Sequence, residues 1–545
     1  MTDIGTFDVI VVGAGSSGCA LAARLSEDPE RSVLLVEAGP RFAGIDAYPP
    51  ELRYSSLFGA SVPGHPNNWS FVANLRPGAQ QPLSRGKVVG GSSALNGAIF
   101  SRGLPEDFAS WVAEGAEAWS YDQVLPFFTR LERDMDIAGG DHGGHGPVPV
   151  SRVGRAEWSP VSAAFHAACG QAGFPADPDV NGPGSIGAGA LPLNHVEGVR
   201  FNMALAYLDP AVDRPNLRVL ADTVVHRIVL SGKRATGIEA KSGGERIEAR
   251  AGEVVLCAGA IKSPHLLMLS GIGPADDLAA FGIPVLHELP HVGRNFTDHC
   301  TVHLPMQLPG TSRMRVDPTL RAMSEVALHY TAEGSDVHSD MMMMQNIVPI
   351  NVAALQEASL VQKLRGLALA MRQLSWAKLK DQLIAQWDLA ITIILMQGRS
   401  RGEVRLTSAD PLAAPRIDYH YLEDPEDLRR LREAMRLAAQ LVDSAPYRAI
   451  GARRTGPSDA VLASDALLDE HLRLHVGTSV HTASTCRMGT SAGNSVVDQY
   501  CRVHGIENLR IADTSIMPSV VRRCPNATAV MIGERVAEFL ARPGA

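Results

Sequence analysis

The sequence predicts an α/β protein (α+β overall): a nucleotide-binding domain built on a parallel sheet, plus a second domain of antiparallel sheet and helices. Two observations lead to this prediction. A buried-type apolar run at Phe7–Val12 is followed by a glycine-rich turn, by a helical pattern at Ser17–Leu25 and by a second apolar run at Ser32–Val36. Strand, helix and strand in this order form a βαβ unit. Short strands further along the chain, separated by turn residues, predict a meander.

The remaining elements follow from the same patterns. Three short runs predict the antiparallel meander: Val224–Leu230, Ala235–Ala240 and Arg246–Arg250. Other apolar runs predict separate strands, at Asn216–Leu220, Glu253–Cys257 and Asn508–Ala512. Apolar residues at helical spacing predict helices at Ile261–Leu269 and Ala527–Leu540. The stretch 312–385 is predicted to be helical, and its methionine run Met341–Met344 to fill core or line a pocket, with a cofactor or metal role as the alternative.

Composition and charge exclude several classes of protein. With 545 residues the chain is long enough for two domains. A net charge of −8 and a pI of about 6.1 argue against nucleic-acid binding. The seven cysteines are scattered without a CxxC pair, so we expect no disulfide framework and no metal site. No apolar run reaches the 18 residues of a membrane span, and no signal peptide precedes Phe7, so a cytoplasmic location is expected.

The glycine-rich turn has the spacing of a dinucleotide-binding site. Gly13 permits the tight turn, Gly15 lets a pyrophosphate approach the backbone, and Gly18 lets the helix pack against the strand. The helix N-terminus offers free N–H groups to the phosphates. Glu37 ends the second strand, where its carboxylate can accept hydrogen bonds from ribose hydroxyls. These residues predict a dinucleotide site without distinguishing FAD from NAD.

Five further segments carry a family resemblance. They are Arg85–Gly97 (RGKVVGGSSALNG), Gly259–Gly273 (GAIKSPHLLMLSGIG), His481–Gly489 (HTASTCRMG) and the pair Ala512–Pro518 (ADTSIMP) and Cys524–Thr528 (CPNAT). Together with the glycine-rich turn they resemble the glucose–methanol–choline (GMC) oxidoreductase family, from Phe7 to the C-terminal helix. The resemblance implies a Rossmann-like FAD-binding domain and a substrate domain. It also implies oxidation of an alcohol to an aldehyde or ketone by hydride transfer to flavin N5, since no side chain can accept a hydride.

The resemblance assigns cofactor contacts residue by residue. The ADP fingerprint comprises Gly13, Gly15, Ser16, Ser17, Gly18, Glu37 and Ala38, and the backbone of Val225 meets the adenine. The flavin loop comprises Arg85, Val89, Gly91, Ser92, Asn96, Gly97 and Ala98. Further contacts are Ala258, Asp513, Pro525, Asn526 and Thr528. Some relatives attach FAD covalently through a histidine just before the asparagine; here that residue is Leu95, so the resemblance implies non-covalent FAD.

Two residues match the catalytic positions. His481 matches the catalytic histidine, and imidazole suits the removal of a hydroxyl proton. Cys524 stands where the family usually has Asn or His; a thiol is a weak hydrogen-bonding group, so a small filler of the pocket wall is the alternative to a catalytic role. His475 and His504 are predicted to be structural or surface residues. Arg522 and Arg523 precede Cys524; if either faced the pocket it would favour an acidic substrate or a carboxylate product, and the alternative is a solvated loop or an ion pair within the flavin domain.

The motifs place the two domains and leave the electron acceptor open. Residues 1–155, 215–301 and 481–545 are assigned to the FAD-binding domain, and 156–214 and 302–480 to the substrate domain. Asn67–Trp69, Asp107–Trp111 and Trp119–Tyr121 resemble a bacterial subgroup associated with the redox peptide mycofactocin. This favours a dehydrogenase over an oxidase, with oxygen, a quinone or a redox peptide as acceptor.

A small-molecule alcohol is the expected substrate, and the methionine-rich segments hint at an apolar or aromatic one. The alternative function is a lyase on the same scaffold, of the hydroxynitrile lyase or fatty-acid photodecarboxylase type.

Overall fold

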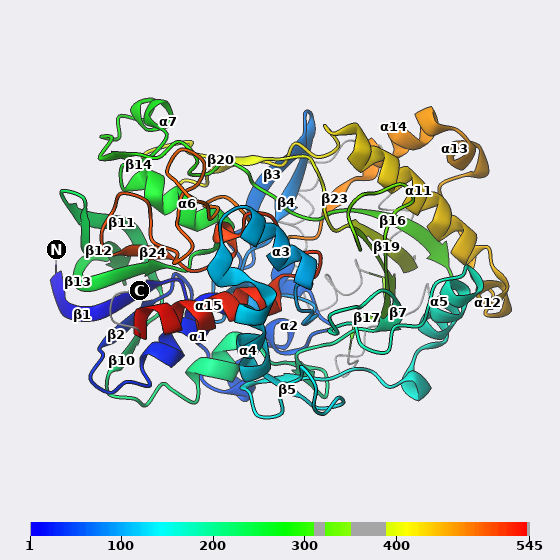
Figure 1. Ribbon diagram of the computed structural model, residues 1–545, viewed down its shortest axis with the longest axis horizontal. Helices are drawn as coiled ribbons and strands as arrows, with labels where there is room; N and C mark the ends of the chain where they lie inside the picture. Colours follow the sequence, from blue (N-terminus) through cyan, green and yellow to red (C-terminus); the bar gives the residue numbers. More distant parts are fainter. Residues whose placement is uncertain (1, 310–321, 350–388, 542–545) are drawn as a thin grey trace.

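A computed structural model describes residues 2–309, 322–349 and 389–541. Two seven-stranded sheets stand at opposite ends of the elongated molecule (Figure 1). The strands of the first sheet, in spatial order, are β10 (Leu217–Leu220), β2 (Val33–Val36), β1 (Thr2–Val12), β13 (Glu245–Leu256), β12 (Arg234–Ser242) and β11 (Thr223–Ser231), with β24 (Leu509–Ile511) also paired to β13. The strands from β10 to β13, and β24, run parallel, whereas β11, β12 and β13 form the predicted antiparallel meander. The fold is the Rossmann-like α/β arrangement that the sequence predicts.

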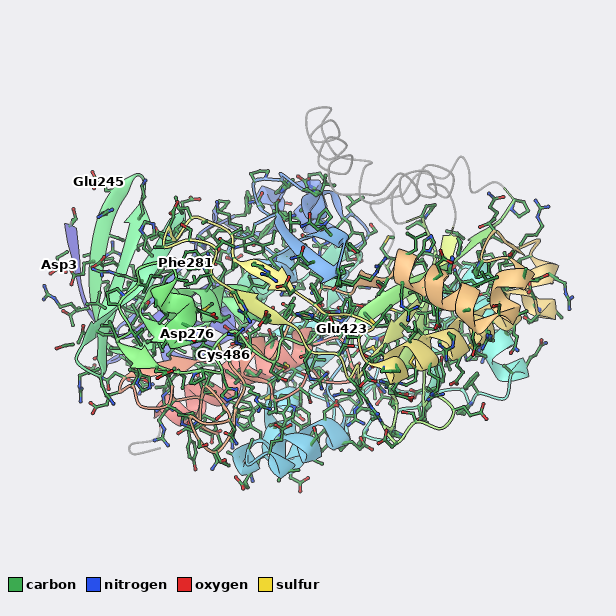
Figure 2. The ribbon with its side chains drawn as sticks, turned by 90° about the horizontal axis from the view of Figure 1, so that it is seen from above. Asp3, Glu245, Asp276, Phe281, Glu423 and Cys486 are labelled. Atoms are coloured by element: carbon green, nitrogen blue, oxygen red, sulfur yellow. The ribbon has the colours of Figure 1, made fainter. Side chains whose placement is uncertain are left out.

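One strand prediction is wrong. The runs 246–250 and 253–257, predicted as two strands, fall on the single strand β13, which ends at Leu256. Its first half pairs with β12 and its second half with β24, while β1 runs beside it from the pair Thr2–Ile247 to the pair Val12–Leu256. The pairing with β1 keeps the chain extended where the sequence suggested a break. Figure 2 shows Asp3 and Glu245 at the outer end of these two strands.

Two helices from opposite ends of the chain pack together over the first sheet. Helix α1 (Ser16–Leu25) follows the glycine-rich turn, and α15 (Asn526–Ala541) closes the chain. The two backbones nearly touch, because a Cβ added at Gly533 would lie 2.3 Å from the carbonyl oxygen of Ser17. Helix α4 (Tyr121–Leu131) packs against α15, and α6 (Gly259–Leu269) follows β13 directly. The N-termini of α1, α6 and α15 thereby come to the edge of the sheet where β1 and β13 end.

The second sheet is antiparallel. Its strands, in spatial order, are β22 (Arg453–Arg454), β16 (Cys300–Gln307), β19 (Leu389–Leu395), β18 (Met341–Asn346), β17 (Ser324–Tyr330) and β7 (Gly187–Ala190), with β23 (Gly477–Thr478) also paired to β16. Helices α5 (Pro160–Gln171) and α11 (Pro425–Val442) pack against it. A smaller sheet between the two ends joins β20 (Glu403–Arg405), β21 (Arg416–Asp418), β3 (Phe71–Arg76) and β4 (Ala79–Leu83) (Figure 1).

The described part of the chain also contains shorter strands and α-helices. The strands are β5 (Glu132–Asp134), β6 (Val148–Val150), β8 (His195–Val196), β9 (Val199–Arg200), β14 (Ile272–Gly273) and β15 (His287–Glu288). The helices are α2 (Pro50–Arg53), α3 (Pro105–Ala113), α7 (Ala275–Ala279), α12 (Ala445–Ala449), α13 (Asp459–Ala463) and α14 (Asp465–His475).

The helical prediction for 312–385 is wrong where the structure describes this stretch. Residues 322–349 contain the strands β17 and β18. The remainder of the predicted helix, residues 312–321 and 350–385, lies outside the described residues. The methionine run lies in β18, where Met341 and Met343 pack into the main core of the second sheet and Met342 packs with Leu191 and Leu193 on the other face. Helix propensity is outweighed here because both faces of the strand are covered. The methionines are core residues, as one of the two interpretations held.

Two further expectations concern the whole chain. Every one of the seven cysteines is buried and free of disulfide bonds. Within the described ranges, no helix has both the length and the apolar character needed to cross a bilayer. The assignment of chain segments to two domains stays a prediction.

Candidate active site

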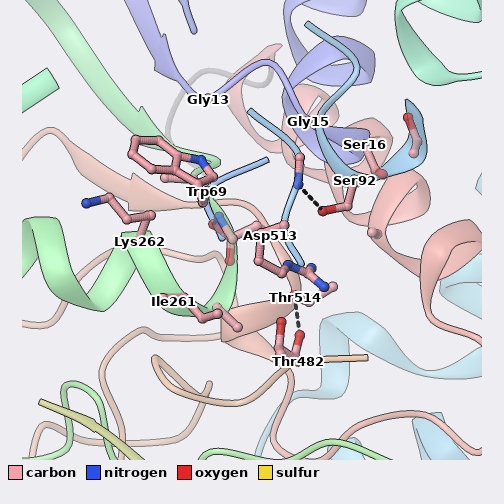
Figure 3. A pocket seen from close by; sticks show the side chains of 18 of the residues that line it. Gly13, Gly15, Ser16, Trp69, Ser92, Ile261, Lys262, Thr482, Asp513 and Thr514 are labelled. Carbon is pink, nitrogen blue, oxygen red and sulfur yellow. Dashed lines mark hydrogen bonds between the residues drawn. The ribbon is translucent and has the colours of Figure 1, made fainter. Parts of the chain in front are cut away.

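A cavity of about 430 Å³ lies at the edge of the first sheet where β1 and β13 end. Figure 3 shows this cavity with Gly13 and Gly15 on one side and Thr482, Asp513 and Thr514 on another. Most of the residues predicted from the sequence line it: Gly13, Gly15, Ser16, Ser17, Glu37, Ala38, Arg85, Gly91, Ser92, Asn96, Gly97, Val225, Ala258, His481, Asp513, Cys524, Pro525 and Asn526. Four predicted residues do not line it: Gly18, Val89, Ala98 and Thr528. Segments that are hundreds of residues apart in the chain therefore meet around one space.

The glycine-rich turn leaves no room for side chains. Gly13 has a φ of +104°, and a Cβ there would lie 2.5 Å from the carbonyl oxygen of Cys257. A Cβ at Gly18 would lie 1.9 Å from the carbonyl oxygen of Gly13, so Gly18 serves the packing of α1 rather than the cavity wall. The close fit exposes the backbone of the turn to the cavity, as pyrophosphate binding requires.

The loop 85–97 rests on this turn. A Cβ at Gly91 would lie 2.6 Å from the Cα of Gly15, and the N–H of Gly90 donates to the carbonyl of Ala14 at 2.7 Å. The hydroxyl oxygen of Ser92 accepts the N–H of Gly86 at 3.1 Å (Figure 3). These contacts hold the second predicted motif against the first.

The positions of Asn96, Ala98 and Val89 explain why only the first lines the cavity. The Asn96 side-chain oxygen accepts the N–H of Ala98 at 3.0 Å, and Ala98 has a φ of +60°. Ala98 therefore shapes the loop around Asn96 without facing the cavity itself. Val89 is fully buried in the core below the loop.

Glu37 presents a buried carboxyl group to the cavity. One of its oxygens accepts the N–H of Ala14 and the other that of Gly39, each at 3.0 Å. Burial raises the pKa of Glu37 to about 7, although these backbone donors oppose the shift. Each carboxylate oxygen retains a second lone pair, which suits a ribose hydroxyl.

Asp513 ties the C-terminal segment to the start of α6. Its carboxylate accepts the N–H of Gly259 at 2.8 Å and the hydroxyl of Ser263 at 2.6 Å through one oxygen, and the N–H of Ser515 at 2.8 Å through the other. The Thr514 hydroxyl donates to the carbonyl of Thr482 at 2.8 Å (Figure 3). Asp513 thus fixes two walls of the cavity relative to each other.

Several buried polar atoms around the cavity lack a hydrogen-bond partner in the described structure. The Asn526 side-chain oxygen accepts the hydroxyl of Ser16 at 2.8 Å, whereas its amide nitrogen is unpartnered. The hydroxyls of Thr482 and Ser479, which also line the cavity, are unpartnered too. Thr528 is fully buried behind the wall. Buried polar atoms are normally paired, so these groups point to a polar ligand in the cavity.

His481 contacts a second histidine that the sequence analysis did not single out. The two Nδ1 atoms of His481 and His299 lie 2.8 Å apart, and the rings meet edge to face at 84° with centroids 5.0 Å apart. Burial, with smaller contributions from His299 and Arg85, holds the pKa of His481 well below its ordinary value. Burial lowers the pKa of His299 to about 3. Both rings are therefore neutral near pH 7.

The backbone around these histidines is held by Asp298. One of its oxygens accepts the N–H groups of His299 and His481, each at 2.7 Å. The other accepts the hydroxyls of Thr478 at 2.8 Å and Tyr419 at 2.9 Å. The signal in the sequence was an Asp-His pair just before an apolar strand, but nothing in that pattern links it to a residue 182 positions away.

Arg85 supports the same loop from the other side. Its guanidinium donates to the carbonyl of Val480, which has a φ of +63°. The side chain is therefore committed to positioning the residue before His481. Burial lowers the pKa of Arg85, while Asp298, Tyr419 and Asp513 act in the opposite direction.

Cys524 and Leu95 form apolar parts of the cavity wall. Cys524 is 5% exposed, and burial raises the pKa of its thiol to about 12. Leu95 is likewise buried and packs in a small apolar cluster with Tyr48 and Leu205. Neither side chain offers a nucleophile at neutral pH.

The arginines beside Cys524 do not line the cavity. Arg522 forms a buried ion pair with Asp107 at 2.7 Å, so the interpretation as an internal ion pair is confirmed for this residue. Arg523 is fully buried and donates to Ser339 and Ser185.

Neither of the other two histidines weighed from the sequence lines the cavity. His504 contacts the hydroxyl of Ser495, and His475 contacts the carbonyl of His471.

Further cavity residues were missed by the sequence analysis. Trp69 has the ammonium groups of Lys262 and Lys87 on its ring, 5.0 and 5.3 Å from the centroid. Burial lowers the pKa of Lys262 to about 8, and its nitrogen lies 3.0 Å from Nδ1 of His265. The sequence contains no periodic signal that would join Trp69 to α6, because the contact depends on the smaller sheet that carries β3.

Comparisons with known proteins identify the family to which this chain belongs. Two models described as GMC oxidoreductase match residues 7–301 and 398–533. A GMC-type oxidoreductase of Rhodococcus erythropolis is 36% identical over 548 residues, covering 99% of each chain. The oxygen-dependent choline dehydrogenase 1 of Chromohalobacter salexigens is 35% identical, over 99% of this chain and 95% of the relative. The mitochondrial choline dehydrogenase of Mus musculus is 34% identical, over 98% of this chain and 89% of the relative.

Solved structures agree with the sequence relatives. Pyridoxine 4-oxidase from Mesorbium loti superposes with a TM-score of 0.84 at 29% identity, over 99% of this chain and 100% of that one. Formate oxidase superposes with a TM-score of 0.85 over 99% of each chain; its identity of 22% shows a shared fold alone.

The residues present fit FAD. The glycine cradle of Gly13 and Gly91 has no space for a Cβ, Glu37 keeps acceptor lone pairs, and the amide of Asn526 lacks a partner within the described structure. With both family models matched across most of its length, the chain belongs to the GMC oxidoreductase family and is an FAD-dependent alcohol oxidoreductase.

Proposed function

We propose that the protein is a dehydrogenase that oxidises a neutral, apolar or aromatic alcohol, with His481 as the base and FAD bound without a covalent link. The single observation that carries this proposal is the position of His481: it lines the cavity, and its Nδ1 is engaged by His299 at 2.8 Å, which leaves Nε2 for a substrate hydroxyl. When bound, FAD supplies the hydride acceptor that no side chain provides.

The protonation state of His481 suits a base. A base must be neutral before it takes a proton, and burial keeps the pKa of His481 well below its ordinary value. The O–H bond of the alcohol breaks as the Nε2–H bond of His481 forms. Cys524 contributes a neutral, weakly polar wall to the same cavity.

The charged groups of the cavity argue for a neutral substrate. The carboxylates of Glu37 and Asp513 already accept backbone or hydroxyl hydrogen bonds, and the cationic side chains are Arg85 and Lys262. A quaternary ammonium such as choline would find no free carboxylate among the lining residues that the structure describes. The apolar side chains that line the same cavity, such as Leu95 and Ile99, suit a hydrocarbon or aromatic group instead.

Two finer points have separate support. Leu95 occupies the place of the flavin-linking histidine of some relatives and has no nucleophilic atom, which supports non-covalent FAD; acid precipitation should leave all of the flavin in the supernatant. The resemblance at Trp69, Trp111 and Trp119 to a subgroup linked to a redox peptide supports a dehydrogenase.

The test is an anaerobic titration of the purified holoenzyme followed by its visible spectrum. Benzyl alcohol, 1-butanol, pyridoxine, choline and glucose would be added in turn, and air admitted after bleaching. We expect benzyl alcohol or 1-butanol to bleach the flavin and choline to leave it oxidised, with slow recovery in air. Rapid recovery in air would contradict the dehydrogenase assignment, and absence of bleaching by every alcohol would contradict alcohol oxidation by this site.

A further inference from the structure

The contact between His481 and His299 contains a single shared proton. The atoms that approach to 2.8 Å are both Nδ1, so one ring must donate and the other accept. If His299 donates, the neutral His481 carries its own proton on Nε2 and has no lone pair for a substrate. If His481 donates, its Nε2 keeps a lone pair that can take a proton from a substrate. Only the second arrangement makes His481 a base.

The same arrangement is required after the proton has been taken. An imidazolium carries protons on both nitrogens, so a protonated His481 can only donate from Nδ1. His299 must then accept, and a hydrogen bond from a charged donor is roughly twice as strong as a neutral one. A neutral His299 meets this requirement, since burial keeps its pKa near 3 and prevents it from taking a second proton.

The surroundings of His299 fix it in this place. The imidazole is fully buried, and hydrogen bonds to the backbone of Val521 and Met396 partly oppose the effect of burial on its pKa. Asp298 holds the backbone N–H groups of His299 and His481 on one carboxylate oxygen, each at 2.7 Å. When His299 accepts at Nδ1, the proton of its neutral ring lies on Nε2, so this tautomer requires an acceptor there, and the backbone of Val521 and Met396 supplies hydrogen bonds to the ring.

We propose that His299 is the positioning residue of the base: its Nδ1 accepts the Nδ1 proton of His481, directs the His481 Nε2 lone pair toward the alcohol and stabilises the imidazolium formed. The inference rests on the proposed function, because it assumes that His481 accepts the hydroxyl proton. His299 itself does not contact the cavity.

The test compares four variants of the holoenzyme. His299→Asn keeps an acceptor oxygen near the place of Nδ1, and His299→Leu removes it. His303→Leu is the matched control, because His303 lies on β16, which begins one residue after His299, its Nδ1 contacts Thr392 at 3.1 Å, and it does not line the cavity. His481→Ala tests the base itself. Nitrogen-15 NMR of histidine-labelled protein shows which nitrogen of His481 carries the proton, and anaerobic stopped-flow with benzyl alcohol gives the rate of flavin reduction.

We expect the wild type, His299→Asn and His303→Leu to carry the His481 proton on Nδ1, and His299→Leu to move it to Nε2. We also expect His299→Leu to slow flavin reduction by roughly a hundredfold, and His299→Asn by less than about threefold. Wild-type nitrogen shifts in His299→Leu would overturn the inference, whatever the rate. If His481→Ala reduced its flavin as fast as the wild type, the proposed base would be wrong instead, and the NMR result would still decide the position of the proton.

Discussion

One carboxylate oxygen of Asp298 accepts the backbone N–H of His481 at 2.7 Å and so joins the segment before β16 to the segment that carries the proposed base. The same oxygen also accepts the backbone N–H of His299, and the other oxygen accepts the hydroxyls of Thr478 and Tyr419. A single buried side chain therefore fixes the backbone of both histidines.

Replacing Asp298 should lower the free energy of unfolding, and the decrease should grow with the number of acceptor oxygens that the substitution removes. Asp298→Ala leaves buried donors unpaired, and we expect the free energy of unfolding to fall by roughly 2–4 kcal/mol, with a slower flavin reduction. Asp298→Asn keeps one acceptor oxygen and should lose less than half of this. Thermal unfolding and stopped-flow reduction measure the two effects; equal melting temperatures for Ala, Asn and wild type would contradict the role given to Asp298.

The rate of flavin reduction should be insensitive to pH around the ordinary pKa of histidine. Burial lowers the pKa of His481 well below 6.5, so the neutral base persists as the pH falls from 8 through 6.5, and protonation removes it only at much lower pH. Anaerobic reduction rates between pH 5 and 8.5 check this. A loss of half the rate near pH 6.5 would show that His481 keeps an ordinary pKa.

Local patterns predicted the nucleotide-binding half of the fold well. The glycine spacing, the strand before it and the acid at Glu37 are all set by one ligand, so their signals reinforce one another within 40 residues. The patterns were less informative in the second sheet. Met341–Met344 is a strand because both of its faces are covered, which depends on neighbours far away in the sequence.

The site was predicted only as far as contiguous motifs reach. Cofactor residues and His481 lie in such motifs, whereas His299 and Trp69 come to the site through β16 and β3, which no spacing rule connects to it. Gly18 and Ala98 show the opposite error: each belongs to a motif, but one packs a helix and the other shapes a loop.

Cys524 should tolerate replacement by small side chains. Its thiol is neutral because burial raises its pKa to about 12, so it has no charge to lend to the reaction. We expect Cys524→Ala and Cys524→Ser to change the rate of flavin reduction by less than about threefold, a difference of about 0.7 kcal/mol in the barrier. A loss of a hundredfold in Cys524→Ala, restored in Cys524→Ser, would instead assign it a hydrogen bond to the substrate.

Glu37 should make the stability of the protein depend on pH. Burial raises its pKa from 4.5 to about 7, so the folded state holds a proton that the unfolded state has released at intermediate pH. The stability linked to this group is complete below pH 4.5 and is lost as the pH rises to about 7, by on the order of 1–3 kcal/mol. Glu37→Gln does not titrate. The melting temperature of wild type minus that of Glu37→Gln should therefore fall between pH 5 and 7 and then level off; a difference that rises with pH would contradict a raised pKa.

Gly91 offers the sharpest test of the cofactor cradle. Its φ of +55° strains any other residue, and a Cβ there would lie 2.6 Å from the Cα of Gly15. Gly232, in the turn between β11 and β12, is the matched control, because its φ of +61° imposes the same backbone strain with no atom within 4 Å of an added Cβ. Gly232→Ala should cost about 1 kcal/mol of stability and leave the flavin content unchanged.

Gly91→Ala must in addition push the loop away from the turn that faces the pyrophosphate. We expect the purified Gly91→Ala protein to carry less than about a tenth of the wild-type flavin. A loss of about 1.4 kcal/mol in the free energy of FAD binding already weakens that binding tenfold. Absorbance per protein measures the flavin content directly. If Gly91→Ala and Gly232→Ala retained flavin equally, the contact between Gly91 and Gly15 would not be what holds the cofactor site together.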